Sequence, residues 1–273
     1  MKNESVVKSF LISIELCATL RVGLIIIKMS FFSSKTSLVN TGLLYGMTDI
    51  HSHILPGVDD GVVAFNEAVK SLQWLKSVGI HRIYLTPHIM TDFSKNNYEY
   101  ISEQYELFKD KLINDGIGDI PEMKLGAEYM LEFAFEKHKN ERLLTYNNNH
   151  ILVETSYITP PVGFLSILEK LLCDGFSPVL AHPERYVYLD IKDCGNLKKQ
   201  GILFQLNFLS LTGAYGSLAK EKASQLLQKG YYNYAGSDFH NLARHEKYYS
   251  LKSFTDKQIA SLRILIYNNT ELW

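Results

Sequence analysis

The segment Met47-Thr48-Asp49-Ile50-His51-Ser52-His53 is predicted to form a short β-strand that ends in two histidines. Side chains alternate between the two faces of a strand, so His51 and His53 lie on one side and can reach the same metal ion. Asp49 shares that side and can orient a histidine without binding metal itself. A histidine pair alone is weak evidence, because buried histidines often only hydrogen-bond within a core. The loop that follows, Pro-Gly-Val-Asp-Asp-Gly at 56–61, favours the metal interpretation.

Six more strand-like segments follow this one, with a helical pattern between each pair. The predicted strands are 47–51, 82–86, 122–127, 150–154, 178–181, 202–206 and 231–235. Gly79, Gly175, Gly201 and Gly230 come after a helical run and before a strand, as glycines at helix C-termini do. Seven β-then-α units predict an α/β fold with a parallel sheet, and right-handed crossovers favour its closure into a barrel.

Residue types that bind metals stand at the carboxyl ends of these strands. In chain order they are His51 and His53, His88, Glu128, Glu154, His182, Asn207, and Asp238 with His240. The carboxyl ends of barrel strands meet on one face, where active sites lie. Glu154 ends the apolar run Ile151-Leu152-Val153, where a carboxylate is costly unless it is paired or binds metal. The sequence therefore predicts a metal centre on this face.

The other polar residues near this face have competing interpretations. Asp59 and Asp60 are typical of a turn that caps the helix beginning near Ala64; we favour that interpretation for Asp59 and a metal role for Asp60. We expect His81, His138 and His150 to be structural or exposed. We expect Asp92 and the polar run 94–98 to be a surface loop, and we leave His245 undecided.

The bulk composition narrows the class of protein. The chain has 273 residues, of which 46% are hydrophobic and 21% charged, as in an ordinary globular domain. A net charge of −1 offers no basic field for nucleic acid, so an anionic substrate needs local positive charge. Cys17, Cys173 and Cys194 are few and widely spaced, which favours a reducing compartment and predicts a cytoplasmic protein. None of them begins the Cys-x5-Arg motif of a thiol phosphatase.

Residues 1–46 differ from the rest and are predicted to be an extension outside the catalytic domain at 47–273. The apolar stretch 10–27 is interrupted by Glu15 and Arg21, which argues against stable membrane insertion or a signal peptide. A membrane anchor or signal is the alternative. Met29 is a candidate for the natural start, with the preceding residues as an upstream extension.

Together these motifs resemble the polymerase-and-histidinol-phosphatase (PHP) superfamily. The matching pieces are Asp49-x-His51-x-His53, Thr86-Pro87-His88, Glu128, Glu154, His182-Pro183-Glu184-Arg185 and Ser237-Asp238-x-His240-Asn241. More narrowly, they are similar to the CpsB/CapC group of bacterial protein-tyrosine phosphatases, found with capsule and exopolysaccharide loci. The resemblance covers about residues 47–250 and implies a distorted TIM-like (β/α)7 barrel of the PHP type.

The resemblance also implies a site with three divalent ions. His51, His53, Glu128 and Asp238 would hold the first ion; Glu128, Glu154 and His182 the second; and Asp60, His88 and His240 the third. Such imidazole and carboxylate ligands suit Mn²⁺, Fe²⁺ or Zn²⁺, and the resemblance favours manganese. Two arginines are candidates for gripping the phosphate, Arg185 first and Arg244 second, because Arg244 stands only near the family's usual position.

These observations predict hydrolysis of phosphotyrosine in protein. Clustered cations attract a phosphate dianion and acidify water, and Arg185 adds a planar, bidentate grip. The resemblance implies that the substrate is a tyrosine kinase that controls polysaccharide export. Three alternatives stay open: a small-molecule phosphatase of the histidinol-phosphatase type, a polymerase-associated exonuclease, and a non-catalytic metal-binding module. The oligomeric state has no signal in the sequence.

Overall fold

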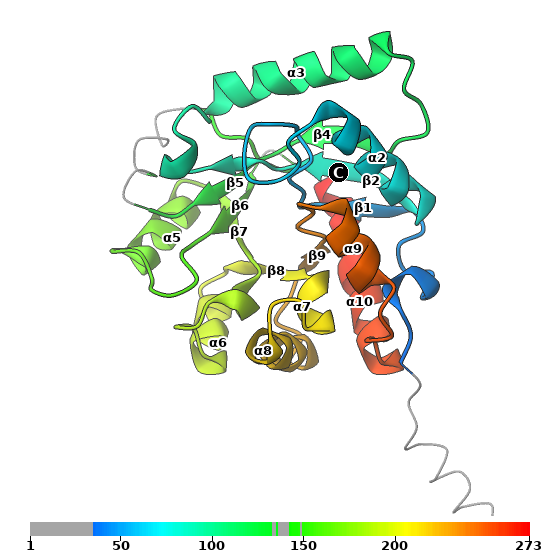
Figure 1. Ribbon diagram of the computed structural model, residues 1–273. Helices are drawn as coiled ribbons and strands as arrows, with labels where there is room; N and C mark the ends of the chain where they lie inside the picture. Colours follow the sequence, from blue (N-terminus) through cyan, green and yellow to red (C-terminus); the bar gives the residue numbers. More distant parts are fainter. Residues whose placement is uncertain (1–34, 133–134, 136–141, 148) are drawn as a thin grey trace, which may run out of the picture. The chain divides into compact units, whose positions relative to one another are not determined.

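The computed structural model describes residues 35–273 except 133–134, 136–141 and 148 (Figure 1). His138, Cys17 and Met29 therefore lie outside the described residues. The described chain belongs to a compact unit that spans Thr36–Trp273. Thr36 pairs with Phe254, and Leu38, Leu43 and Leu44 are buried in the core. The sequence placed residues 36–46 before the catalytic domain. In the structure they pack with the compact unit, because their leucine side chains are part of its hydrophobic core.

Within the described residues the chain forms nine strands in two sheets, and every pairing is parallel. The smaller sheet has the order β1 (Met47–Asp49), β2 (Ile80–Leu85), β4 (Glu122–Leu125). The larger has the order β3 (His88–Ile89), β5 (Glu128–Met130), β6 (His150–Glu154), β7 (Ser177–Ala181), β8 (Leu203–Asn207), β9 (Tyr234–Gly236). The fold is mixed α/β, as predicted.

Each of two predicted strands, 82–86 and 122–127, is followed at once by a second short strand that belongs to the other sheet. Pro87 has no N–H to donate, and it separates β2 from β3. Gly126 and Ala127 separate β4 from β5, and side chains crowd Gly126 so closely that a Cβ there would lie 3.0 Å from the Tyr146 ring. Backbone hydrogen bonds continue across both breaks, from Gly126 N to Leu85 O at 2.9 Å and from Glu128 N to Pro87 O at 3.1 Å.

Helices and short 3-10 turns connect the strands (Figure 1). The helices are α2 (Phe65–Ser77), α3 (Tyr98–Asn114), α5 (Phe164–Cys173), α6 (Ile191–Lys199), α7 (Phe208–Thr212), α8 (Ser217–Gln228), α9 (Leu242–Tyr249) and α10 (Asp256–Asn268). The 3-10 turns are η1 (Leu38–Asn40), η2 (Thr91–Phe93), η3 (Pro183–Arg185) and η4 (Asn269–Leu272). In the described part of the chain, none of these helices combines the length and the apolar character that crossing a membrane requires.

Strand β6 explains how a carboxylate enters the interior. Ile151 and Val153 belong to the main core, whereas Leu152 belongs to a second buried cluster with Tyr84 and other strand residues. The strand is therefore buried on both faces. Because side chains alternate along a strand, Glu154 lies on the same face as Leu152, which is the face of the second buried cluster. It is 2% exposed there, so its charge needs partners.

Candidate metal centre

All nine predicted metal ligands lie close together at the carboxyl ends of the strands. Among the described residues, three groups have ligand atoms within 4.8 Å of one another. They are His51, His53, Glu128 and Asp238; His53, Asp60, His88 and His240; and His88, Glu128 and Glu154. The first group has the membership that the sequence suggested for one ion. In the third, His88 stands where we expected His182, whose Nε2 lies 3.1 Å from Glu128 Oε1 and 3.9 Å from Glu154 Oε2.

Glu128 is the centre of this arrangement. Its Oε2 lies 3.1 Å from His51 Nε2 and 3.3 Å from both His53 Nε2 and His88 Nδ1. Yet within the described residues Oε2 has no hydrogen bond of acceptable geometry. Burial raises the pKa of Glu128, but the charge of His51 and hydrogen bonds from His182 and other histidines lower it well below its usual range. The side chain is therefore an ionised, buried carboxylate whose free oxygen faces several imidazole nitrogens.

In their neutral form, His51 and His53 present lone pairs, not protons, to that oxygen. His51 Nδ1 lies 3.0 Å from Gln205 Oε1, and His53 Nδ1 lies 2.9 Å from Asp59 Oδ2. Because both oxygens accept, each Nδ1 carries the hydrogen and each Nε2 presents its lone pair. The two Nε2 atoms are only 3.1 Å apart. Lone pairs and a carboxylate held this close repel one another unless a cation lies between them, so the donor set fits a metal ion.

The electrostatic field favours positive charge at the same place. Burial lowers the pKa of His51, but the nearby carboxylates of Glu128 and Asp238 more than reverse this and raise it to about 9. Burial disfavours the charged form of Asp238 and so raises its pKa. The positive charges of His51, His240, His182 and Arg185 outweigh this and lower the pKa well below its usual value. A proton or a divalent cation satisfies this field. The buried His, Asp and Glu cluster therefore suits metal binding.

Asp59 has a larger role than the turn we favoured. Its Oδ2 accepts from His53 Nδ1 at 2.9 Å and from the backbone N–H of His88 at 3.1 Å. Its Oδ1 accepts from Gly61 N at 3.0 Å. A Cβ on Gly61 would lie 2.1 Å from His53 O, so only glycine lets the loop approach this closely. Asp59 thus orients one candidate ligand and fixes the backbone of another, and it also makes the predicted turn.

Asp49 stabilises backbone, and within the part of the chain that the structure describes it forms no hydrogen bond with an imidazole. Its Oδ1 accepts from Ser237 N at 3.0 Å and lies 3.4 Å from His51 N. Burial raises the pKa of Asp49 to about 6 against these hydrogen bonds. The outcome differs from our expectation that it would orient a histidine ring; Gln205, 154 residues away in sequence from His51, does that.

Two candidate ligands have unusual backbone conformations. His182 has φ 33° and Asp238 has φ 50°, both in the left-handed region that favours glycine. His182 directly follows β7, and Asp238 lies two residues after the end of β9. Asn207 Nδ2 donates to Asp238 Oδ2 at 2.7 Å, so Asp238 is held from a third strand as well. The strain, of order 1–2 kcal/mol per residue, is typical of functional positions.

Arg185 is held at the mouth of the cluster by two tyrosines. Its Cζ lies 4.2 Å from the ring centroids of both Tyr157 and Tyr215. Its Nη1 donates to Asp238 Oδ2 at 3.0 Å. Arg244 lies on Tyr215 as well, with Cζ 4.7 Å from the centroid. Both arginines and both tyrosines line a cavity of about 340 Å³ together with Glu128 and other candidate ligands.

The remaining polar residues sort clearly. His81 and His150 are half-buried, and each contacts a tyrosine ring edge-on, Tyr45 and Tyr234 respectively. His245 is buried; it lies 3.1 Å from Ser237 O, and burial lowers its pKa to about 4, so it is a neutral structural group.

The loop at 94–98 differs in part from the surface loop we expected. Asp92 is exposed, but Asn96 is buried and donates to Val58 O at 3.0 Å and His88 O at 2.7 Å. The loop contributes this one side chain because the backbone near His88 needs a donor. No spacing in the sequence indicated Asn96, Gln205, Tyr157 or Tyr215, since each acts through a contact distant in sequence.

Comparison with known proteins agrees with this geometry. The family model for capsular polysaccharide synthesis, CpsB/CapC, matches residues 47–269. The tyrosine-protein phosphatase YwqE of Bacillus subtilis is 30% identical over 203 residues, covering 72% of this chain and 78% of the relative. The tyrosine-protein phosphatase CpsB of Streptococcus pneumoniae is 30% identical over 206 residues, covering 72% and 84%.

A solved structure is similar over most of both chains. It comes from a study of YwqE and CpsB as metal-dependent tyrosine phosphatases, and it superposes with a TM-score of 0.69 at 26% identity. It covers 82% of this chain and 92% of the compared chain. The family match spans the strand ends that carry the cluster. The chain therefore belongs to the CpsB/CapC family of capsular polysaccharide synthesis proteins.

Proposed function

We propose that this protein is a metal-dependent phosphatase that hydrolyses phosphotyrosine in proteins. The observation that carries the proposal is the convergence of imidazole lone pairs on the buried carboxylate of Glu128, beneath a cavity that Arg185 lines. Family membership supports phosphotyrosine over a small amino-alcohol ester, because the similar proteins are named tyrosine-protein phosphatases.

We propose three divalent ions, with Mn²⁺ first and Fe²⁺ or Zn²⁺ as alternatives. The first ion would be held by His51, His53, Glu128 and Asp238. The second would be held by Glu128, Glu154 and His182, and His88 also lies near it, with Nδ1 3.1 Å from Glu154 Oε1. The third would be held by Asp60, His88 and His240, with His53 nearby. When bound, the ions supply positive charge for the phosphoryl oxygens and acidify water toward neutral pH.

The protein's own residues would bind and orient the phosphate. Arg185 presents a guanidinium that contacts the rings of both Tyr157 and Tyr215, so its position at the cavity is restricted. A planar fork of donors matches phosphate oxygens in a way that a lysine ammonium does not. Arg244 lines the same cavity and is the second candidate for contacting the phosphate. A phenolate leaves readily, so phosphotyrosine needs little help from a general acid.

We further propose that the two sheets form one distorted (β/α)7 barrel of the PHP type. The support is a parallel bridge between Ser52 and Phe239, beyond the ends of β1 and β9. His53 N donates to Phe239 O at 2.8 Å, and Asp238 N to His51 O at 2.9 Å. These bonds join an edge of the smaller sheet to an edge of the larger one.

We propose a cytoplasmic location, and a tyrosine kinase of capsule or exopolysaccharide synthesis as the phosphoprotein substrate. Reducing surroundings suit the widely spaced cysteines, and the family model is described by capsular polysaccharide synthesis.

The test of the proposed function compares two substrates on protein reconstituted with Mn²⁺. Hydrolysis of a phosphotyrosine peptide should exceed that of histidinol phosphate in kcat/KM, and Glu128→Gln should lose activity on both. Preference for histidinol phosphate would refute phosphotyrosine as the substrate class. Equal activity of wild type and Glu128→Gln would refute the metal centre as the catalytic site.

A further inference from the structure

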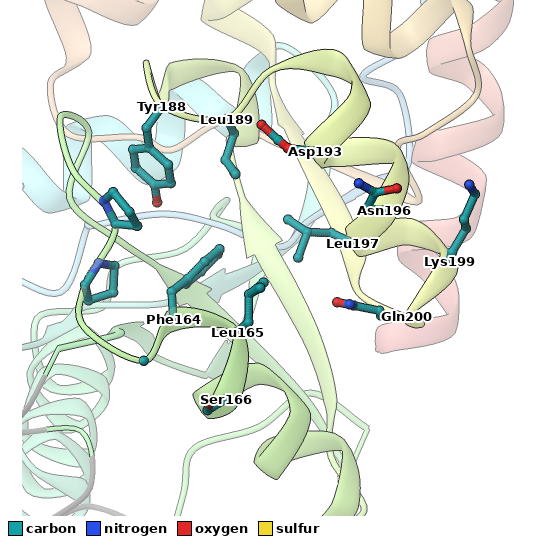
Figure 2. Close-up of a pocket in the computed structure, with 13 residues that line it drawn as sticks. Phe164, Leu165, Ser166, Tyr188, Leu189, Asp193, Asn196, Leu197, Lys199 and Gln200 are labelled. Carbon is teal, nitrogen blue, oxygen red and sulfur yellow. The ribbon is translucent and has the colours of Figure 1, made fainter.

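A groove separate from the catalytic cavity lies between α5 and α6. It encloses about 780 Å³. Figure 2 shows Phe164 and Leu165 from α5 on one side and Leu189 and Leu197 on the other, with side chains directed into the same space, while Asn196 and Gln200 stand at its rim. The lining is therefore mainly aliphatic and aromatic, with polar groups at the edge, as in sites that take an apolar side chain on a polar backbone.

The two loops that form this groove also form the catalytic cavity. The loop after β6 carries Tyr157 into the cavity and, three residues later, Pro160 into the groove. The loop after β7 carries Arg185 into the cavity and Tyr188 into the groove. The loops are tied together by a hydrogen bond from Val187 N to Tyr157 O at 2.9 Å. The groove and the proposed phosphotyrosine site are therefore adjacent, because the same two loops line both.

A stack of tyrosine rings joins the cavity to the groove. Tyr157 and Tyr186 stack with centroids 6.0 Å apart, and Tyr186 and Tyr188 with centroids 5.9 Å apart. An extended peptide advances about 3.4 Å per residue, so two ring spacings correspond to roughly three or four residues. A polypeptide whose phosphotyrosine enters the cavity therefore reaches the groove within that number of residues.

The surface along this path exposes aliphatic side chains. Ile158 is 68%, Val162 99% and Val187 69% exposed, and Leu165 at the groove itself is 50% exposed. Scattered exposed aliphatics need no explanation, but these four come from the same two loops and the helix that follows one of them. Their grouping beside a catalytic cavity indicates contact with a partner chain.

We propose that the groove between α5 and α6 binds an apolar side chain of the phosphoprotein substrate, three or four residues from the phosphotyrosine. This inference rests on the proposed phosphotyrosine activity and deepens it, since it names a second contact that selects among phosphotyrosine sites. The occupant is the substrate polypeptide because the loops that line the groove also line the cavity for the phosphorylated residue, two ring spacings away.

The experiment measures kcat/KM on short phosphotyrosine peptides with alanine and serine flanks. Four peptides carry one leucine, placed three or four residues before or after the phosphotyrosine, and a fifth carries none. We expect about a tenfold higher kcat/KM for at least one leucine peptide, as partial burial of three extra carbons would give. p-Nitrophenyl phosphate, which has no flanking residues, reports the chemistry alone.

Leu165→Asp is the test variant and Leu107→Asp the matched control, since Leu107 is an exposed leucine (56%) on α3, outside the groove lining. Leu165→Asp should abolish the advantage of the leucine peptide and leave p-nitrophenyl phosphate hydrolysis within twofold of wild type. Leu107→Asp should behave as wild type on every substrate. Leu165→Ala, which removes apolar surface without adding charge, should give an intermediate preference.

Several results would overturn the proposal. Equal rates on all five peptides, or a leucine preference that survives in Leu165→Asp, would show that the groove is not a substrate site. Equal slowing of p-nitrophenyl phosphate by Leu165→Asp would show a structural role. A wild-type dimer in sedimentation velocity that Leu165→Asp dissociates, without change in peptide preference, would assign the groove to a second copy. Hydrolysis of p-nitrophenyl phosphate with no hydrolysis of any phosphotyrosine peptide would refute the proposed function itself.

Discussion

Replacing Arg185 by alanine tests how the site binds phosphate. The side chain is fixed by two tyrosine rings, each 4.2 Å from Cζ, and by a 3.0 Å hydrogen bond to Asp238. Such an oriented donor loses little freedom when the transition state forms, so its removal should cost the full value of one charge-stabilising group. That value is about 10²-fold in rate, or about 2.7 kcal/mol. Arg185→Lys keeps the charge but loses the fork and should fall between wild type and alanine.

The assay is steady-state hydrolysis of a phosphotyrosine peptide at saturating Mn²⁺, with metal content measured on the same samples. Both kcat and kcat/KM should fall, because the contact strengthens as charge develops on the phosphoryl oxygens. Metal content should stay at the wild-type value, since arginine does not bind metal ions and Asp238 keeps its hydrogen bond from Asn207. Arg244→Ala is the matched control on the other contact of Tyr215 and should have a smaller effect.

The contact with Asp238 also provides the refutation. If Arg185 acts by holding Asp238 in place, its loss should weaken metal affinity, and high Mn²⁺ should restore the rate of Arg185→Ala. Such rescue would show that Arg185 organises the cluster, and its assignment to the phosphate would be wrong.

Three further predictions concern the metal centre and the chain outside it. Glu128→Gln should reduce metal content by more than one equivalent, because one carboxylate faces ligands of two groups; full metal content with a near-normal rate would contradict the shared role. Chelation should abolish activity and Mn²⁺ should restore it, whereas iodoacetamide should have little effect. Cys194 is buried, and burial raises the pKa of its thiol to about 11, so the thiol stays protonated at neutral pH. A folded but inactive triple Cys→Ser variant would argue against metal catalysis. Removal of residues 1–28 should leave kcat/KM unchanged, because the compact unit begins at Thr36; membrane fractionation of the full chain, with release on truncation, would show that the segment is an anchor.

The positions of the cluster residues could be predicted because parallel strands bring their carboxyl ends together. His88, Glu154 and His182 are far apart in sequence, but each follows a recognisable apolar strand, and the face of each side chain follows from alternation. The parallel α/β fold followed from the same strands. The short strands β3 and β5 did not, because the two or three residues that follow Pro87 or the Gly126-Ala127 pair are too few to carry a strand pattern of their own.

The residues that orient the cluster could not be predicted. Gln205 lies in the middle of an apolar strand, and nothing local distinguishes it from a polar residue on an exposed face. Tyr157 and Tyr215 are loop tyrosines among many in the chain, and their role depends on the contact that each makes with Arg185. Asp59 has the sequence context of a turn and also makes one, so its bond to His53 is visible only once the loop is folded.

The left-handed backbone at His182 and Asp238 bears on how such a protein changes over generations. Glycine adopts these φ angles without strain, so His182→Gly or Asp238→Gly would relieve backbone strain of order 1–2 kcal/mol while deleting a side chain that the chemistry needs. Natural selection for activity therefore has to act against substitutions that relieve strain in the backbone. Once that selection is relaxed, a descendant of this chain that lost the proposed metal ligands at the turns after β7 and β9 would lose the proposed metal centre and gain unstrained backbone at both turns.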